Sequence, residues 1–140
     1  MGKRQEYVLG FMFSEDRTKV ALIKKNREGF NQIFNGIGGK IEDNELPEKA
    51  MVREFQEETG VLITSDKWSV FGEFKTKKYL VYCFKTFSDE IHNIRTMTDE
   101  PVNYFTLDEL DKIKMMPNLK WLIPLALDKN QKYFSSLFIS

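Results

Sequence analysis

Cysteine, histidine and a surplus of either charge are scarce in this sequence. Its 140 residues include one cysteine, Cys83, and one histidine, His92, and 21 basic residues balance 21 acidic ones. A lone cysteine excludes an internal disulfide and a multi-cysteine zinc site. Cys83, in the apolar run YLVYCF, is predicted to be a core residue, and His92, in a polar stretch, a solvated loop residue. A net charge of zero argues against a general attraction to nucleic acid or an anionic membrane.

Long apolar runs are also missing. No window approaches the roughly 20 apolar residues of a membrane-spanning helix, and the start MGKRQEYVLGFMF lacks the apolar segment of a signal peptide. We therefore expect a soluble, cytoplasmic protein without a membrane partner. The length suits one domain with its own core, and no repeat or linker divides the chain, so residues 1–140 are predicted to form a single α/β unit.

Apolar and β-branched runs predict the strands. Residues 6–13 and 19–25, joined by the turn SEDRT, are typical of a hairpin. Residues 67–74 and 78–87 are typical of a second antiparallel pair. Later in the chain the sequence predicts a short strand over 102–107 and helical segments over 107–113 and 118–129, with Pro124 limiting or kinking the last.

A glycine-rich segment precedes the most regular helix. Residues 26–40, NREGFNQIFNGIGGK, carry four glycines and are predicted to be a loop, whose backbone can approach a ligand closely. Pro47 suits the first turn of a helix and Gly60 the position just past its end. Together they predict a helix over residues 47–59.

Charges crowd onto one face of this helix in the segment REFQEETG, residues 53–60. Glu54, Glu57 and Glu58 point within an arc of roughly 100° of one another and would repel without a cation between them. Hard cations such as Mg²⁺ or Mn²⁺ prefer carboxylate and carbonyl oxygens and bridge carboxylates to phosphates. The three glutamates are therefore predicted metal ligands, and Arg53, four residues before Glu57, can brace its carboxylate.

An alternative is a solvated helix face with an ordinary Arg53–Glu57 pair, because like-charged neighbours cost only about 0.2–0.5 kcal/mol each. On the segment REFQEE alone this alternative stays open, and the glycines and Glu45 favour the metal site through their spacing in the family motif described next. Lys40, just after the paired glycines, is a candidate phosphate ligand.

The segment GGKIEDNELPEKAMVREFQEETGV, residues 38–61, resembles the Nudix box at every specified position. Those positions are Gly39, Glu45, Arg53, Glu54, Phe55, Glu57, Glu58, Gly60 and Val61. The resemblance implies the Nudix α/β/α sandwich, with a mixed β-sheet between helices, and hydrolysis of a nucleoside diphosphate linked to another group. Glu45 is expected to anchor the loop, and Phe55 and Val61 to lie in the core.

Two further segments, FNGIGGK at 34–40 and WLIPLALDKNQKYF at 121–134, are similar to the MutT branch, and most to its animal oxidised-purine nucleoside triphosphatase. That similarity implies an Mg²⁺- or Mn²⁺-dependent conversion of a triphosphate to a monophosphate and pyrophosphate. It also implies that the carbonyl of Gly38 and the carboxylate of Glu100 join the helix glutamates at the metals. A glutamate takes the proton of the attacking water, and we rank Glu54 ahead of Glu100 for this role.

The same resemblance suggests which residues bind the base. Asn35 matches an asparagine that reads the purine edge, and Met116, Asn118 and Leu119 stand where the animal enzyme has a tryptophan and two aspartates. Leucine forms no hydrogen bond, and Asn118 replaces a carboxylate. We therefore predict a weaker or different preference for 8-oxo-guanine and 2-oxo-adenine triphosphates over normal ones.

Two other functions stay open at this stage. One is hydrolysis of another nucleoside diphosphate derivative, such as ADP-ribose or a dinucleoside polyphosphate. The other is a nucleotide sensor without turnover, although such a sensor would be expected to lose a metal-ligand position and the box here is complete. In each case the partner is a small nucleotide, and no oligomeric state is indicated.

Overall fold

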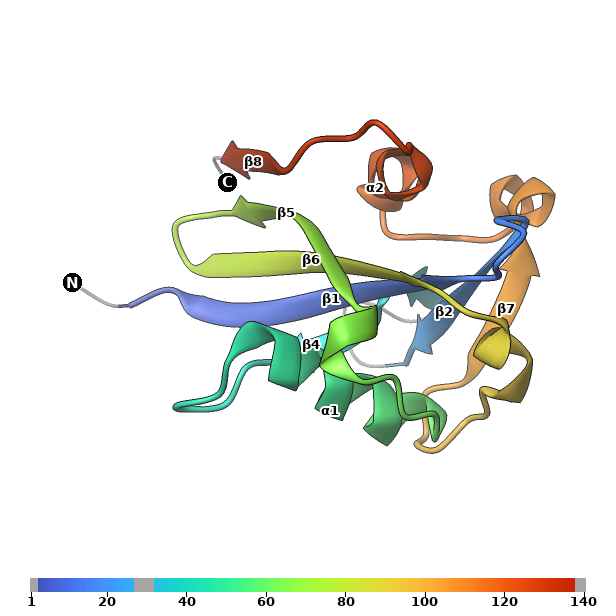
Figure 1. Ribbon diagram of the computed structural model, residues 1–140, viewed down its shortest axis with the longest axis horizontal. Coiled ribbons are helices and arrows are strands. Elements are labelled where there is room, and N and C mark those ends of the chain that lie inside the picture. Colours follow the sequence, from blue (N-terminus) through green and yellow to red (C-terminus); the bar gives the residue numbers. More distant parts are fainter. Residues whose placement is uncertain (1–2, 27–31, 138–140) are drawn as a thin grey trace.

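The computed structural model describes residues 3–26 and 32–137, which form one mixed β-sheet with an α-helix on each face (Figure 1). The strands are β1 Gln5–Phe13, β2 Lys19–Lys25, β3 Ile33–Asn35, β4 Ile37–Lys40, β5 Ser69–Lys75, β6 Tyr79–Phe87, β7 Val102–Thr106 and β8 Phe134–Leu137. The α-helices are α1 Pro47–Thr59 and α2 Leu119–Leu127. Short 3-10 helices are η1 Ser65–Lys67, η2 Asp89–Asn93 and η3 Leu107–Lys112. This architecture confirms the predicted α/β/α sandwich.

β1 is the central strand of the sheet. The strand order is β3-β2-β1-β6-β5-β8, with β4 paired to β1 and β7 paired to β2. β1 runs parallel to β6 along its whole length and antiparallel to β4 between Tyr7↔Lys40 and Gly10↔Ile37. The glycine-rich strand β4 is thereby held beside the first half of β1, on the side of the sheet that α1 covers (Figure 1).

The core consists of two apolar clusters, one on each face of the sheet. The cluster beneath α1 contains Phe55 and Val61, which confirms the core positions predicted for both. The cluster beneath α2 contains Cys83, whose side chain is fully buried, and this burial raises the pKa of its thiol. Cys83 is therefore an inert core residue, as predicted.

Most predicted elements are present, with small shifts at their ends. β1 and β2 form the predicted hairpin, β5 and β6 the second antiparallel pair, and β7 the later short strand. α1 covers the predicted range 47–59. Gly60 adopts the left-handed conformation, with φ of 78°, and ends α1 by donating its N–H to the Gln56 carbonyl at 2.9 Å.

The glycine-rich segment differs from its prediction. A loop was expected over residues 26–40, of which 27–31 lie outside the described residues, but Ile33–Asn35 and Ile37–Lys40 are strands. β3 pairs with β2, and β4 with β1. Pairing with distant strands stabilises these segments, an effect that their own glycine-rich composition does not reveal.

The C-terminal elements agree in part with their predictions. α2 continues three residues beyond Pro124, so the proline does not end the helix at its own position. The helical segment expected over 107–113 is the 3-10 helix η3. His92 is exposed as predicted, although it lies in η2 rather than in a loop. No helix in the described parts of the chain has the length and apolar character needed to cross a membrane.

Candidate active site

Arg53 is the centre of a polar cluster on α1. Its guanidinium donates to both carboxylate oxygens of Glu45, from Nε at 2.8 Å and from Nη2 at 2.9 Å. Nη1 donates to Glu54 Oε2 at 2.9 Å and, at a longer 3.3 Å, to Glu57 Oε1. Nη2 also reaches the Lys40 carbonyl oxygen at 3.1 Å. Arg53 thereby ties the segment before α1 to the glutamates on it, and these bonds raise its pKa further.

Glu45 anchors the segment that leads into α1. Besides its paired bond with Arg53, it accepts the backbone N–H of Glu42 at 3.0 Å. The Arg53 guanidinium holds the pKa of Glu45 below its usual range. These contacts confirm the predicted anchoring role of Glu45, and they show that Arg53 is bound more closely by Glu45 and Glu54 than by Glu57.

Gly38 and Gly39 bring β4 into close contact with β1 and with α1. A Cβ atom on Gly38 would lie 1.9 Å from the carbonyl oxygen of Val8, so a side chain there would force the two strands apart. A Cβ atom on Gly39 would lie 2.6 Å from Cδ of Glu54. The Glu54 carboxylate therefore lies directly against the backbone of β4, next to the residue whose carbonyl is the predicted metal ligand.

A second group of charges surrounds Lys25, the last residue of β2. Glu100, in the segment before β7, accepts the N–H of Asn26 through Oε2 at 3.0 Å. Its other oxygen, Oε1, lies 3.4 Å from Lys25 Nζ. The Lys25 charge also acts on the carboxylates of Glu54 and Glu58. The structure thus brings the predicted ligands Glu54, Glu58 and Glu100 within electrostatic reach of one ammonium group.

Burial raises the pKa of Glu54 and of Glu58 above the usual glutamate range. At Glu54 the hydrogen bond and charge of Arg53 oppose this effect without cancelling it. At Glu58 the charge of Lys25 and a hydrogen bond from Thr98, at 3.3 Å, do the same. Both carboxylates are therefore incompletely compensated, and an additional cation nearby would favour their ionised forms.

The chemistry of the predicted ligands fits a hard divalent cation. Carboxylate and carbonyl oxygens of this kind come from Gly38, Glu54, Glu57, Glu58 and Glu100. Within residues 3–26 and 32–137, however, no three acidic, histidine or cysteine side chains are grouped closely enough to hold a metal ion as they stand. Arg53 and Lys25 instead contact Glu54 and Glu100, and the Glu57 side chain is 54% exposed. A metal would require these side chains to converge.

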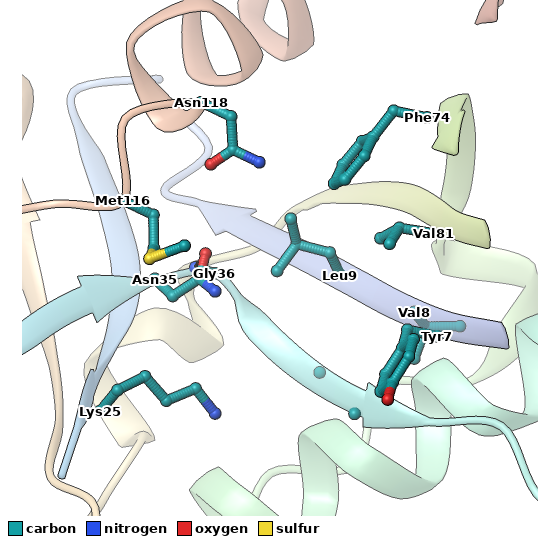
Figure 2. A pocket seen from close by; sticks show the side chains of 12 residues that line it. Tyr7, Val8, Leu9, Lys25, Asn35, Gly36, Phe74, Val81, Met116 and Asn118 are labelled. Atoms are coloured by element: carbon teal, nitrogen blue, oxygen red, sulfur yellow. Dashed lines mark hydrogen bonds between the residues drawn. The ribbon is translucent and has the colours of Figure 1, made fainter. Parts of the chain in front are cut away.

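A pocket of about 210 Å³ opens beside β4 (Figure 2). Apolar side chains line its walls, chiefly Leu9, Phe74, Val81 and Met116. Its polar side chains include Lys25, Asn35 and Asn118. In Figure 2, Phe74 lies on one side of the pocket and Met116 and Asn118 lie on the other. The backbone of Gly38 and Gly39 completes the lining, so the pocket adjoins the contact of Glu54 with β4.

The predicted base-binding residues divide into two groups. Asn35, Met116 and Asn118 all line the pocket. Leu119 does not: its side chain is fully buried in the core cluster beneath α2, because the first turn of that helix directs it toward the sheet. The assignment of Leu119 to the pocket is therefore corrected. Lys40 also lies outside, in a separate surface hollow that it shares with Arg53 and Glu54.

The two amide side chains of the pocket present different groups. Asn35 Oδ1 accepts the N–H of Gly36 at 2.8 Å, which leaves its NH₂ group as a donor. Asn118 Oδ1 is buried and has no hydrogen-bond partner among the described residues. A buried acceptor without a partner is costly, so Asn118 is suited to a ligand that carries an N–H donor.

Lys25 and Phe74 are pocket residues that sequence reasoning missed. Lys25 ends the strand after Lys24, and alternation along β2 places the two lysines on opposite faces. That pattern shows that the lysines differ, but the partner of each depends on where the Glu100 segment packs. Phe74 alternates with Glu73 in β5, a signal for a buried face but not for a pocket.

The sequence profile of the NUDIX domain matches residues 3–125. Because that match covers most of the chain, the protein belongs to the NUDIX family. The fold is also that of MutT-like Nudix hydrolases. A MutT structure from work on Aliivibrio salmonicida and Vibrio cholerae aligns with a TM-score of 0.76 and 21% identity, over 89% of this chain and 98% of that one.

Other relatives are similar over different extents. The mutator MutT protein of Bacillus halodurans aligns with a TM-score of 0.75 and 20% identity, over 96% of this chain and 89% of that one. The NUDIX domain of Shewanella oneidensis NrtR, solved with ADP-ribose, aligns with a TM-score of 0.75 and 16% identity, over 89% and 86%. An 8-oxo-dGTP diphosphatase of Proteus vulgaris is 63% identical over 27 residues, which are 19% of this chain and 24% of that protein.

Proposed function

We propose that this protein is a Mg²⁺- or Mn²⁺-dependent hydrolase that converts a nucleoside triphosphate to a monophosphate and pyrophosphate. The observation that carries the proposal is the contact of Glu54 with Gly39, which places a largely buried carboxylate between a mainly apolar pocket and a surface hollow of mixed charge that contains Lys40 and Arg53. The proposal includes a small nucleotide rather than nucleic acid as partner, a cytoplasmic location, and one Nudix domain over residues 1–140. Balanced charge and a single cysteine support the first two.

The size of the pocket supports binding of part of a nucleotide. Its volume of about 210 Å³ is below the roughly 300–1,000 Å³ of pockets that enclose a whole small molecule. The base would lie among the apolar side chains, and the phosphates would cross the backbone of Gly39 toward Lys40. The hollow that contains Lys40 and Glu54 has a volume of about 580 Å³, which leaves room for a polyphosphate.

The chemistry assigned to the chain's own residues follows from this layout. Gly38, Glu54, Glu57, Glu58 and Glu100 are the proposed metal ligands, and a bound Mg²⁺ would neutralise the phosphates and acidify a coordinated water. Glu54 is the proposed base. Arg53 holds its Oε2, which leaves Oε1 to accept the proton of the water that attacks phosphorus.

The pocket also supports a proposal about the base. The NH₂ group of Asn35 offers a donor, and the buried Oδ1 of Asn118 requires one from the ligand. Leu119 stands where the animal enzyme has the second of its two aspartates. Because Leu119 lies in the core, the pocket has no polar side chain in place of that aspartate. A site that lacks a hydrogen-bonding group discriminates differently from one that has it. We therefore propose that the preference for oxidised purine triphosphates is weak or altered.

A panel of nucleotides tests this substrate assignment. kcat/KM would be measured with Mg²⁺ for dGTP, 8-oxo-dGTP, dATP, 2-oxo-dATP and the pyrimidine triphosphates, with ADP-ribose and a dinucleoside polyphosphate included. A site built to hydrogen-bond a polar group of its substrate rejects an analogue without that group by roughly 10⁴–10⁵-fold. We expect pyrophosphate release with oxidised-over-normal ratios well below that scale, and below about 10³. A ratio near that value for both oxidised purines would contradict the proposed role of Asn118.

The same panel separates the alternative functions. Release of two monophosphates from ADP-ribose, without turnover of triphosphates, would assign the protein to another nucleoside diphosphate derivative. Tight binding of a nucleotide without any turnover would instead indicate a sensor. The structural similarity to the NrtR domain, at 16% identity, concerns the fold and does not favour either alternative.

A further inference from the structure

Lys25 is buried to an unusual degree for a lysine. Its side chain is 14% exposed, and that of its partner Glu100 is 17% exposed. Lysine is rarely buried unless a carboxylate pairs with it, because removing an ammonium group from water is costly. The pair nevertheless has a long Nζ–Oε1 distance of 3.4 Å, compared with about 2.7–2.9 Å for a strong charge-assisted bond. The Lys25 side chain is therefore largely buried while its bond to Glu100 is weak.

Glu100 holds its position without help from Lys25. Its Oε2 accepts the backbone N–H of Asn26 at 3.0 Å, which fixes the carboxylate beside the end of β2. The backbone N–H of Glu100 in turn donates to the Thr98 hydroxyl at 3.1 Å. Only Oε1 faces the ammonium group. If Lys25 moved, Glu100 would stay in place with one oxygen available for another cation.

The charge of Lys25 interacts with two carboxylates besides that of Glu100. Burial raises the pKa of Glu58 and of Glu54, and the charge of Lys25 acts on both pKa values in the opposite direction. Arg53 does not contact Glu58 or Glu100 among its bonds within the described residues. On this side of the site, Lys25 therefore provides compensation that Arg53 does not.

Lys25 also lines the pocket that is proposed for the nucleotide. Its ammonium group extends toward the glycine strand β4, on the same side of the pocket as Asn35 (Figure 2). Lys25 therefore contacts Glu100 and also lines the ligand space. A modest rotation of the flexible side chain would turn it from the first toward the second.

We propose that Lys25 is the counter-ion of the glutamate site in the metal-free protein, and that a divalent cation displaces its ammonium group from Glu100 into the pocket. Lys25 is then a positioning residue with two opposite effects. Before the metal binds, it competes for the same carboxylate oxygens. Afterwards, it adds positive charge to the edge of the pocket formed by Gly38 and Gly39, whose backbone the phosphates of a nucleotide would cross, a second step that rests on the proposed function.

The first step is tested without any nucleotide. Mn²⁺ would be titrated into wild type, Lys25→Met and Lys24→Met, with free Mn²⁺ measured by electron paramagnetic resonance. Lys24 is the matched control, because it has the same charge but lies over the ring of Phe34 at 5.6 Å. We expect Lys25→Met to bind Mn²⁺ about two- to tenfold more tightly than wild type, the scale of a half-buried charge pair, and Lys24→Met to bind unchanged.

Two controls separate a lost charge from a folding defect. Thermal unfolding shows whether Lys25→Met is folded, and Lys25→Arg keeps the charge. Arginine keeps the positive charge, so its Mn²⁺ affinity should stay within about twofold of wild type. In the wild type, a Mg²⁺ titration followed by NMR of the Lys25 methylene beside the ammonium should show a shift that saturates with metal. If folded Lys25→Met binds Mn²⁺ as tightly as wild type or more weakly, or if the Lys25 signal does not shift, the proposed counter-ion role is overturned.

The second step is tested with a non-hydrolysable triphosphate at saturating Mn²⁺. Lys25→Met should bind it about three- to thirtyfold more weakly than wild type, because a charge near the phosphates is lost. Unchanged affinity would overturn the displacement into the pocket while leaving the counter-ion role in place. If wild type binds no Mn²⁺ at all, the proposed function itself is contradicted. Equal Mn²⁺ affinities of wild type and Lys25→Met would contradict only the counter-ion role.

Discussion

At the scale of single residues, the site is a balance between desolvated carboxylates and a few cations. Arg53 pairs with both Glu45 and Glu54, and Lys25 lies against Glu100. Burial still raises the pKa of Glu54, so the compensation is partial. Such residual cost is expected where a protein holds carboxylates ready for a cation, and it makes individual glutamates separable by mutation.

The two candidate bases can be separated by isosteric substitution. If Glu54 accepts the proton, Glu54→Gln should lower kcat by roughly 10²–10⁴-fold, and Glu100→Gln should have a smaller effect. The rates must be compared at saturating Mg²⁺, since both residues are also proposed ligands. The reverse order of effects would assign the base to Glu100.

Metal affinity should depend on pH in the range set by the raised pKa of Glu54 and Glu58. Metal ligands must be deprotonated, so protons compete with the cation below those pKa values. Because both are raised, Mn²⁺ binding should begin to weaken at a pH above the usual glutamate range as the solution is acidified. Calorimetric Mn²⁺ titrations of the metal-free protein, repeated at pH values from about 8 down to about 4, measure this pH dependence of the affinity. Affinity that stays constant until the ordinary glutamate range would contradict it.

Glu58→Gln should stabilise the metal-free protein at neutral pH. A carboxyl whose pKa is raised by folding favours the folded state only when protonated, so this stability is lost as pH rises through the folded-state pKa. Glu58→Gln removes the charge and so recovers this stability, and its Tm should exceed that of wild type by on the order of a few degrees. The gain should disappear in acid, where Glu58 is protonated. A lower Tm than wild type at pH 7 would show that the bond from Thr98 outweighs burial.

At the scale of elements, the site depends on how closely β4 approaches its neighbours. β4 lies between β1 and α1, and its two glycines have different neighbours. At Gly38 the nearest atom is the backbone oxygen of Val8, whereas at Gly39 it is the flexible carboxylate end of Glu54. The first contact is rigid, and the second can be relieved by rotating a side chain.

Alanine substitutions at the two glycines should therefore have different consequences. Gly38→Ala should destabilise the fold by about 1–3 kcal/mol, the usual cost of overpacking. Gly39→Ala should cost less stability but lower kcat by displacing the Glu54 carboxylate. Urea unfolding and kinetics on both variants measure this contrast. Equal losses of stability would show that Glu54 is held as rigidly as the Val8 carbonyl.

Elements with strong local signals were predictable from sequence, and those made by tertiary pairing were not. α1 was predicted because Pro47 and Gly60 mark both ends of one amphipathic run. β3 and β4 were missed because their hydrogen bonds come from β2 and β1 rather than from local propensity.

The candidate site shows the same division. Glu54, Glu57 and Glu58 share a helix and a fixed spacing, so their proximity was predictable. Lys25 meets Glu100 only because β2 pairs with β7. Leu119 was misplaced because alignment gives its position but not its side-chain direction. The similarity to the animal enzyme, on which that alignment rests, stays a prediction.

At the scale of the whole molecule, the two parts of the candidate site come from different elements. Helix α1, on one face of the sheet (Figure 1), carries Glu54, Glu57 and Glu58. The segment that leads into α2 supplies Met116 and Asn118 to the pocket (Figure 2). Lys85 Nζ donates to the Ala126 carbonyl at 2.9 Å, and Arg17 Nη1 donates to the Leu127 carbonyl at 3.0 Å. These bonds from the sheet satisfy the last carbonyls of α2 and fix the helix relative to the pocket.

The most direct test of the account identifies the products formed from nucleoside triphosphates with Mg²⁺, by phosphorus NMR, for wild type and Glu57→Gln. The variant keeps the size of the side chain but loses a charge that would hold the cation. We predict that wild type forms only a monophosphate and pyrophosphate, and that Glu57→Gln, folded as judged by circular dichroism, is slower by on the order of 10²-fold or more. Release of orthophosphate, no turnover of any triphosphate by wild type, or wild-type turnover by Glu57→Gln would contradict a metal-dependent pyrophosphohydrolase built on this helix.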